Sequence, residues 1–145
     1  MIYITKSPAE TEAIGAALAS SLEERGLKRA FIAMRGEMGV GKTAFTRGFA
    51  SHFGINGIKS PTYTIVNEHV GRVKIFHFDM YRITDGDDLY SIGYDDYIDA
   101  DGYCIAEWSE NIEKEIPEDA IFVTISRVDG NTEGRRIEID ENSGI

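Results

Sequence analysis

One segment restricts the fold of this chain more than any other. Residues 36–43 have the sequence GEMGVGKT and match the pattern G-x-x-x-x-G-K-[ST] at every fixed position. An apolar run of strand length, residues 29–34, precedes this segment, and residues 42–53 follow it with the periodicity of a helix. A strand, a glycine-rich loop and a helix in this order form a nest of backbone N–H groups around phosphate oxygens. The order therefore predicts an α/β fold with a nucleotide phosphate site.

The residue types in this segment suit a nucleoside triphosphate bound with Mg²⁺. Lys42 places a positive charge between the β- and γ-phosphates, and the Thr43 hydroxyl is a ligand for Mg²⁺. The helix that begins near Lys42 adds the positive end of its dipole. The residues expected to bind the nucleotide here are Glu37, Met38, Gly39, Val40, Gly41, Lys42 and Thr43.

Two acidic residues follow strand-like runs and are candidates for the metal site together with Thr43. Asp79 comes directly after the run 73–78, where proteins with this loop hold the second anchor of Mg²⁺. Glu107 follows the run 103–106 and is the next candidate, as a base that orients water or as a further metal-site carboxylate. For Glu107, a surface acid in an acidic region is the alternative. The predicted catalytic residues are Lys42, Asp79 and Glu107, and the predicted metal ligands are Thr43, Asp79 and Glu107.

Three further side chains are weaker candidates, and a fourth is expected to be structural. Thr62 and Thr64 lie in a loop that begins with proline, where a hydroxyl could sense the γ-phosphate; the favoured alternative is a pair of residues with β propensity at the start of a strand. Arg135 could reach a nucleotide, and the alternative is a solvated arm of a hairpin. His77 lies within an aromatic strand, so we expect it to be a core or sheet residue rather than a ligand.

The remaining pattern places elements along the whole chain. Ser7 and Glu10 form the capping box of a first helix, with Pro8 at its first position. Short helices are expected within residues 84–97, and residues 129–131 join the last two strands in an antiparallel hairpin. The strands are expected at residues 29–34, 62–66, 73–78, 103–106, 120–127 and 136–140. The prediction is a single P-loop NTPase-like domain of residues 1–145, with a three-layer α/β fold, a mixed and mainly parallel central sheet and a C-terminal hairpin.

The charge is distributed unevenly. The chain carries 25 acidic residues and 15 Lys or Arg residues, a net charge of −10. Residues 79–119 hold 14 of the acidic residues and two of the basic ones, so this region alone carries −12. A field of that sign repels phosphate backbones and argues against tight direct binding to nucleic acid. The region is either a solvated face that aids solubility or a docking surface for a basic partner.

Cysteine content and hydropathy exclude other classes of protein. Cys104 is the single cysteine, which excludes an internal disulfide and a cysteine-based zinc cluster. The apolar runs are far shorter than the ~20 residues that span a bilayer, and we see no apolar core of a secretory signal. We therefore expect no membrane association and a cytoplasmic location.

Four segments, taken together, resemble the TsaE (YjeE) family, bacterial ATPases of the tRNA threonylcarbamoyladenosine pathway. The resemblance extends from about Ser7 to the end of the chain. The phosphate loop is common to many families, whereas the other three segments, in this order and spacing, are more specific. The four segments are GEMGVGKT at 36–43, SPTYT at 60–64, HFDMYR at 77–82 and Glu107-Trp108.

The resemblance implies a P-loop fold that binds ATP and Mg²⁺ at Lys42 and Thr43. It also implies that Asp79 and Glu107 are metal-site or catalytic carboxylates, with Trp108 beside them. Family members act with two partner proteins, TsaD and TsaB, which transfer a threonylcarbamoyl group to the adenosine next to the anticodon. The resemblance thus implies that this chain hydrolyses ATP to drive or reset that complex and meets tRNA only through its partners.

Other functions fit parts of the pattern. A nucleotide-gated binding module would use the same phosphate loop, with ATP occupancy rather than turnover regulating a partner. A small-molecule kinase fits less well, because such enzymes exclude water with an arginine-bearing lid and the region after Asp79 holds almost no arginine. A GTPase is disfavoured because the chain has no Asn-Lys-x-Asp segment to recognise guanine.

Overall fold

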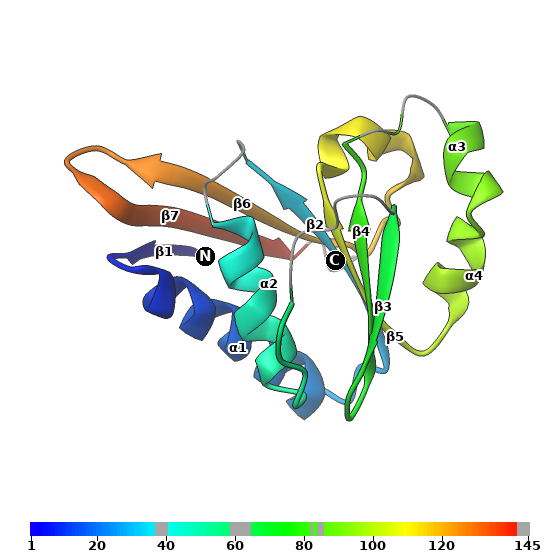
Figure 1. Cartoon of the computed structure of the whole chain (residues 1–145), viewed down its shortest axis with the longest axis horizontal. Coiled ribbons are helices and arrows are strands. Elements are labelled where there is room, and N and C mark those ends of the chain that lie inside the picture. The colour runs from blue at the N-terminus through cyan, green and yellow to red at the C-terminus, as the bar shows by residue number, and fades with distance from the viewer. Residues whose placement is uncertain (37–40, 59–64, 82, 84–85, 142–145) are drawn as a thin grey trace.

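The computed structural model describes residues 1–36, 41–58, 65–81, 83 and 86–141 (Figure 1). Seven strands form one sheet: β1 (Ile2–Thr5), β2 (Arg29–Arg35), β3 (Val66–Val70), β4 (Lys74–Asp79), β5 (Gly102–Glu107), β6 (Ile121–Val128) and β7 (Asn131–Glu141). Their order across the sheet is β1-β7-β6-β2-β5-β4-β3. The four central strands, β6, β2, β5 and β4, run parallel to one another.

Helices cover both faces of this sheet (Figure 1). They are α1 (Pro8–Glu24), α2 (Lys42–Ser51), α3 (Gly86–Ser91), α4 (Tyr94–Asp99) and the 3₁₀ helix η1 (Ser109–Glu115). The helices α1 and α2 pack on one face, and α3 and α4 lie on the other. Within the described ranges, no helix has the length and apolar character needed to cross a membrane.

The strand β2 lies between two hydrophobic clusters. Ile32 and Met34 belong to the cluster under α1 and α2, whereas Phe31 and Ala33 belong to the cluster under α3 and α4. An apolar run that is buried on both faces is typical of a parallel strand covered by helices on both sides. The segment after β2, which carries the predicted phosphate loop, therefore begins at the carboxyl end of a central strand.

Two glycines allow α1 and α2 to approach closely. A Cβ atom added at Gly48 would overlap the backbone of Glu12, and one added at Gly15 would overlap the carbonyl oxygen of Phe45. Because neither position has space for a methyl group, the two helices contact each other along their backbones. This contact positions α2 and thereby the direction of its N-terminus.

The helix α1 begins where the sequence predicts. Ser7 is the N-cap, and its Oγ accepts a hydrogen bond from the backbone N–H of Glu10 at 3.3 Å. The Glu10 carboxylate accepts from the backbone N–H of Lys6, also at 3.3 Å, rather than from that of Ser7. The second half of the expected capping box is therefore displaced by one residue. The short helices expected within 84–97 are confirmed as α3 and α4.

Two strands differ from the prediction. Of the strand expected at 62–66, residues 62–64 lie outside the described residues. The described strand β3 runs from Val66 to Val70, shares only Val66 with the expected range and pairs antiparallel with β4. The middle of β3 is polar because it is an edge strand, so no apolar run marks it in the sequence. The strand β1 is absent from the prediction, and its Ile2 pairs with Glu138 near the other end of the chain.

The sheet is mixed, as predicted, but parallel pairing does not dominate it. The described ladders include three parallel pairs, β2–β5, β2–β6 and β4–β5. They also include three antiparallel pairs, β1–β7, β3–β4 and β6–β7. A mainly parallel sheet is therefore correct only for the four central strands. The predicted C-terminal hairpin is confirmed as β6 and β7, although β7 is longer than the expected 136–140.

Candidate functional site

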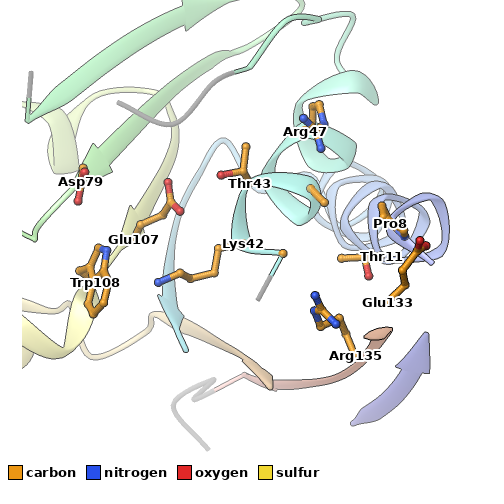
Figure 2. A pocket seen from close by; sticks show the side chains of 12 residues that line it. Pro8, Thr11, Lys42, Thr43, Arg47, Asp79, Glu107, Trp108, Glu133 and Arg135 are labelled. Carbon is orange, nitrogen blue, oxygen red and sulfur yellow. The ribbon is translucent and has the colours of Figure 1, made fainter. Parts of the chain in front are cut away.

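A pocket of about 550 Å³ lies where β4 and β5 end, beside the N-terminus of α2 (Figure 2). In open α/β sheets, ligands bind outside the carboxyl ends of the strands, so this is the expected place for a site. The residues that line the pocket are Pro8, Thr11, Gly41, Lys42, Thr43, Ala44, Arg47, Asp79, Glu107, Trp108, Glu133 and Arg135.

Figure 2 shows how these side chains divide. Asp79, Glu107 and Trp108 form one wall, and Lys42 and Thr43 lie between this wall and the opposite one. The opposite wall contains Pro8, Thr11, Glu133 and Arg135. The pocket therefore brings together all the predicted catalytic and metal-binding residues of the described chain, which come from β4, β5 and α2.

The register of β4 and β5 places the two carboxylates side by side. Asp79 and Glu107 are direct partners in the parallel ladder, each at the last position of its strand. The Oδ1 atom of Asp79 accepts a hydrogen bond from the backbone N–H of Tyr81 at 3.0 Å, which orients the carboxylate after the strand ends. The prediction that both acids follow strands and share one site agrees with this geometry.

The N-terminus of α2 faces the pocket. Gly41 is its N-cap with φ 105° and ψ 18°, a left-handed conformation that favours glycine, which has no side chain to cap the helix. The N-terminus of α2 and the positive end of its dipole therefore lie at the pocket, where an anion is favoured. Glu37, Met38, Gly39 and Val40, which the sequence also predicts to bind nucleotide, lie outside the described residues.

Lys42 is 5% exposed, and its ammonium group contacts a carbonyl oxygen and an aromatic ring. The Nζ atom donates a hydrogen bond to the carbonyl oxygen of Gly36 at 2.9 Å and lies 4.1 Å from the ring centroid of Trp108. Burial lowers the pKa of Lys42, and the negative charges of Glu107, Glu110 and Asp79 oppose this shift. A buried ammonium beside two carboxylates suits a ligand whose phosphates supply further negative charge.

The donor set fits Mg²⁺ only if the ligand contributes oxygens. Among the described residues, no three His, Cys, Asp or Glu side chains gather closely enough to hold a metal ion. Asp79 and Glu107 supply two carboxylates, and Thr43, which lies between the two walls of the pocket, supplies a hydroxyl. Mg²⁺ is usually held by one or two carboxylates together with water and substrate phosphates, so this set is appropriate for Mg²⁺ bound with a nucleotide.

Glu107 has a partner that the sequence analysis missed. Glu107 is 6% exposed, and its Oε2 atom lies 2.6 Å from Nε2 of His77, which is completely buried on β4. The expectation that His77 is a sheet residue is correct, but the side chain also contacts a predicted catalytic group. His77 and Asp79 are two residues apart on one strand and therefore lie on the same face of the sheet. This spacing was the sequence signal that could have placed His77 near the carboxylates.

Trp108 turns the chain immediately after Glu107. Its φ of 60° makes it the one non-glycine residue with positive φ in the described part of the chain. Such a conformation costs roughly 1–2 kcal/mol and occurs mainly where surrounding contacts enforce it. Here the indole packs against the ring of Tyr81, with centroids 5.1 Å apart, and against Lys42. The Oγ atom of Ser109 donates to the carbonyl oxygen of Met34 at 3.0 Å and anchors the next residue.

The opposite wall is built by segments far apart in the sequence. Arg135 reaches the pocket from β7, and its Nη1 donates to the carbonyl oxygens of Thr132 at 2.9 Å and Gly134 at 2.6 Å. Arg47 pairs with Glu12 at 3.7 Å. Of this wall the sequence analysis predicted only Arg135 to reach a nucleotide, because the remaining residues belong to no ligand-binding motif and come from α1 and β7, which meet only in the folded chain. Thr62 and Thr64 lie outside the described residues.

The chain is similar to proteins of one named family. Residues 5–137 match the family described as "Threonylcarbamoyl adenosine biosynthesis protein TsaE". The tRNA threonylcarbamoyladenosine biosynthesis protein TsaE of Haemophilus influenzae is 40% identical over 114 residues, which are 77% of this chain and 70% of that protein. The protein of the same name from Bacillus subtilis is 37% identical over 125 residues, 85% of this chain and 75% of the relative.

A solved structure agrees with this similarity. The crystal structure of YdiB from Bacillus subtilis matches the present chain with a TM-score of 0.76 and 28% sequence identity. The match covers 99% of this chain and 86% of that one. The similarity therefore includes the mixed seven-stranded sheet as well as the sequence.

Proposed function

The chain belongs to the TsaE family of tRNA threonylcarbamoyladenosine biosynthesis proteins, and from this premise we propose that it binds ATP with Mg²⁺ and hydrolyses it in that process. One observation carries the proposal: Lys42 and Thr43 at the N-terminus of α2 face the neighbouring carboxylates Asp79 and Glu107 across a single pocket. Enzymes that transfer a phosphoryl group to water use a cation on the phosphates, a hydroxyl and a carboxylate for Mg²⁺, and a side chain that orients the attacking water.

The N-terminal end of α2 is the proposed phosphate site. Its first backbone N–H groups and the Lys42 ammonium bind the β- and γ-phosphates. Lys42 Nζ then exchanges the Gly36 carbonyl and the Trp108 ring for phosphate oxygens, which bind an ammonium more strongly than a neutral carbonyl does. Arg135 and the wall around it are left for the rest of the nucleotide.

The two carboxylates have different proposed roles, one at the metal and one at the attacking water. Thr43 and Asp79 would hold Mg²⁺, which when bound neutralises charge on the β- and γ-phosphate oxygens. Glu107 is close enough to serve as a further ligand, and we assign it mainly to the attacking water. One oxygen of its carboxylate accepts a hydrogen bond from that water and directs it at the γ-phosphate, as a positioned base does. Hydrolysis then yields ADP, inorganic phosphate and a proton.

The proposed partners are proteins of the TsaD and TsaB families, with tRNA reached only through their complex. We define the acidic surface as the exposed aspartates of α3 and α4: Asp87, Asp95, Asp96 and Asp99. Neither helix contains a basic residue, and both lie on the face of the sheet opposite α1 and α2 (Figure 1). A surface of one charge sign steers a partner of the opposite sign, so a basic partner surface fits here.

The test is ATP hydrolysis by the purified chain, alone and with purified TsaD and TsaB proteins. We expect slow hydrolysis by the chain alone and strong stimulation by the partners, with stimulation that weakens as salt rises. The alternative is a nucleotide-gated binding module. It predicts that Glu107→Gln, which retains ATP binding but hydrolyses slowly, still supports threonylcarbamoyl transfer at the wild-type rate. Absence of hydrolysis under both conditions contradicts the ATPase proposal.

A further inference from the structure

A buried hydrogen bond joins two neighbouring strands directly behind the pocket. His77 lies on β4 opposite Ile105 of β5, and Glu107 lies two positions further along β5, opposite Asp79. Both His77 and Glu107 therefore project from the same face of the sheet. Their side chains meet with Nε2 and Oε2 2.6 Å apart, slightly shorter than the ~2.7–2.9 Å that is usual for charge-assisted N–H···O hydrogen bonds.

The imidazole of His77 has little other polar contact. It is 0% exposed, and within the described part of the chain its Nδ1 atom has no hydrogen-bond partner. A buried polar ring of this kind is costly for the fold, and an apolar side chain would suit the neighbouring Ile75 and Ile105 better. Among the described residues, the hydrogen bond to Glu107 is the polar interaction of the ring that offsets this cost.

The hydrogen bond restricts the Glu107 carboxylate. An ionised carboxylate only accepts hydrogen bonds, so Nε2 of His77 carries the hydrogen. With Oε2 occupied, rotation of the carboxylate is restrained, and Oε1 is left for the ligand side of the pocket, which Glu107 lines. His77 is itself held in a central strand, so the restraint comes from a rigid element.

We propose that His77 is a positioning residue, which fixes the Glu107 carboxylate through Nε2–H so that one oxygen remains directed at the attacking water. This inference rests on the proposed ATP hydrolysis. The other carboxylate, Asp79, is oriented by the backbone N–H of Tyr81, a donor that nearly every residue type supplies. Glu107 depends instead on a particular side chain, and substitution of that side chain tests the inference.

Three variants separate positioning from packing. His77→Leu removes the donor and keeps an apolar side chain in the sheet, whereas His77→Gln places an amide N–H near the former Nε2. Ile75→Val is the matched control, because Ile75 is equally buried on the same face of β4 and does not bond to Glu107. Melting temperature is measured for each variant, and kcat and KM for ATP are measured with partner proteins present.

We expect His77→Leu to lower kcat by about 10- to 100-fold, the range seen when a group that orients a metal ligand is lost. KM should change by less than about twofold, and His77→Gln should recover most of the loss. The double variant His77→Leu/Glu107→Ala should be no slower than Glu107→Ala, because His77 acts only through Glu107. Ile75→Val should alter the melting temperature without a comparable loss of kcat.

A readout without nucleotide tests the contact itself. Histidine-selective ¹H–¹⁵N NMR of the ligand-free chain should contain a slowly exchanging Nε2–H signal of His77. This signal should disappear in Glu107→Ala and persist in Asp79→Asn. Its persistence in Glu107→Ala would overturn the assigned contact.

The kinetic outcomes distinguish the two proposals. An active wild-type chain with equally fast His77→Leu would overturn the role of His77 alone. Additive losses in the double variant, or a His77→Gln variant as slow as His77→Leu at equal stability, would also overturn it. A wild-type chain that hydrolyses no ATP with or without partners would instead overturn the proposed function.

Discussion

Replacing Lys42 should separate its cost to the fold from its contribution to the reaction. Burial lowers the pKa of Lys42 from its ordinary value of 10.5, so the charged side chain destabilises the folded state at neutral pH. The unfolded chain then binds more protons than the folded one, and stability contributed by this group rises as the pH approaches 10.5. Lys42→Met keeps the length of the side chain and removes this desolvation cost.

The contacts of Lys42 indicate how the interactions lost in Lys42→Met compare with the desolvation cost that the substitution removes. The substitution loses the hydrogen bond to the Gly36 carbonyl, worth about 1.5–3 kcal/mol for a charged donor, and the contact with Trp108, worth about 0.5–2 kcal/mol. The removed desolvation cost is of similar size. We therefore expect the free energy of unfolding at pH 7 to change by less than about 1 kcal/mol. Relative to Lys42→Met, the wild type should become more stable as the pH rises toward 10.5.

Lys42→Met should reduce the rate of ATP hydrolysis much more than it changes the stability of the fold. A preorganised donor to developing charge contributes about 2–4 kcal/mol to transition-state stabilisation. Since each 1.36 kcal/mol is tenfold in rate, hydrolysis by Lys42→Met should be slower by about 30- to 900-fold. Steady-state hydrolysis at saturating Mg-ATP with partner proteins measures this loss, and calorimetry in the same buffer measures stability. Lys28→Met, which removes an exposed lysine outside the pocket, is the matched control. Wild-type hydrolysis by Lys42→Met, or a loss explained by a fallen Tm, would refute the reasoning.

Three other predictions concern the carboxylates, the indole and the acidic surface. Asp79→Asn should raise the Mg²⁺ concentration needed for half-maximal activity, whereas Glu107→Gln should lower kcat more than it lowers ATP affinity. Equal losses of ATP affinity in both variants, with unchanged Mg²⁺ dependence, would contradict these separate roles of the two carboxylates. Trp108, the only tryptophan, should shift its emission as Mg-ATP draws Lys42 away, in parallel with the binding curve; a constant spectrum at saturation argues against that movement. Reversing the charges of Asp95, Asp96 and Asp99 on α4 should impair stimulation by the partners and leave basal hydrolysis unchanged. Full stimulation of this triple variant would show that the acidic surface serves only solubility.

Local sequence signals were sufficient for much of the site. The N-cap at Ser7 and the helix that begins at Lys42 depend on residues within one or two helical turns, so their patterns are visible in the sequence. Asp79 and Glu107 follow apolar runs, and parallel strands of one sheet end at the same edge. Their meeting could therefore be predicted without knowing the register.

Other features have no local pattern. The strand β1 is four residues long and pairs with β7, and β3 has a polar middle because it forms the edge of the sheet. Both depend on a partner strand, and backbone hydrogen bonds to that strand leave little trace in the side-chain sequence. The excess of antiparallel pairing over the prediction has the same origin, since β1 and β3 supply two of the three antiparallel ladders.

The contact between His77 and Glu107 shows most clearly what could not be predicted from the sequence. The sequence places His77 in a buried strand and Glu107 at the end of another, and both assignments are correct. Their 2.6 Å contact depends on the register that pairs Asp79 with Glu107, because a shift by one residue would turn His77 to the other face. Periodicity specifies which residues are buried, since it acts within one segment. Register and packing between distant segments specify which of those residues meet, since that choice is made by the whole sheet as it assembles.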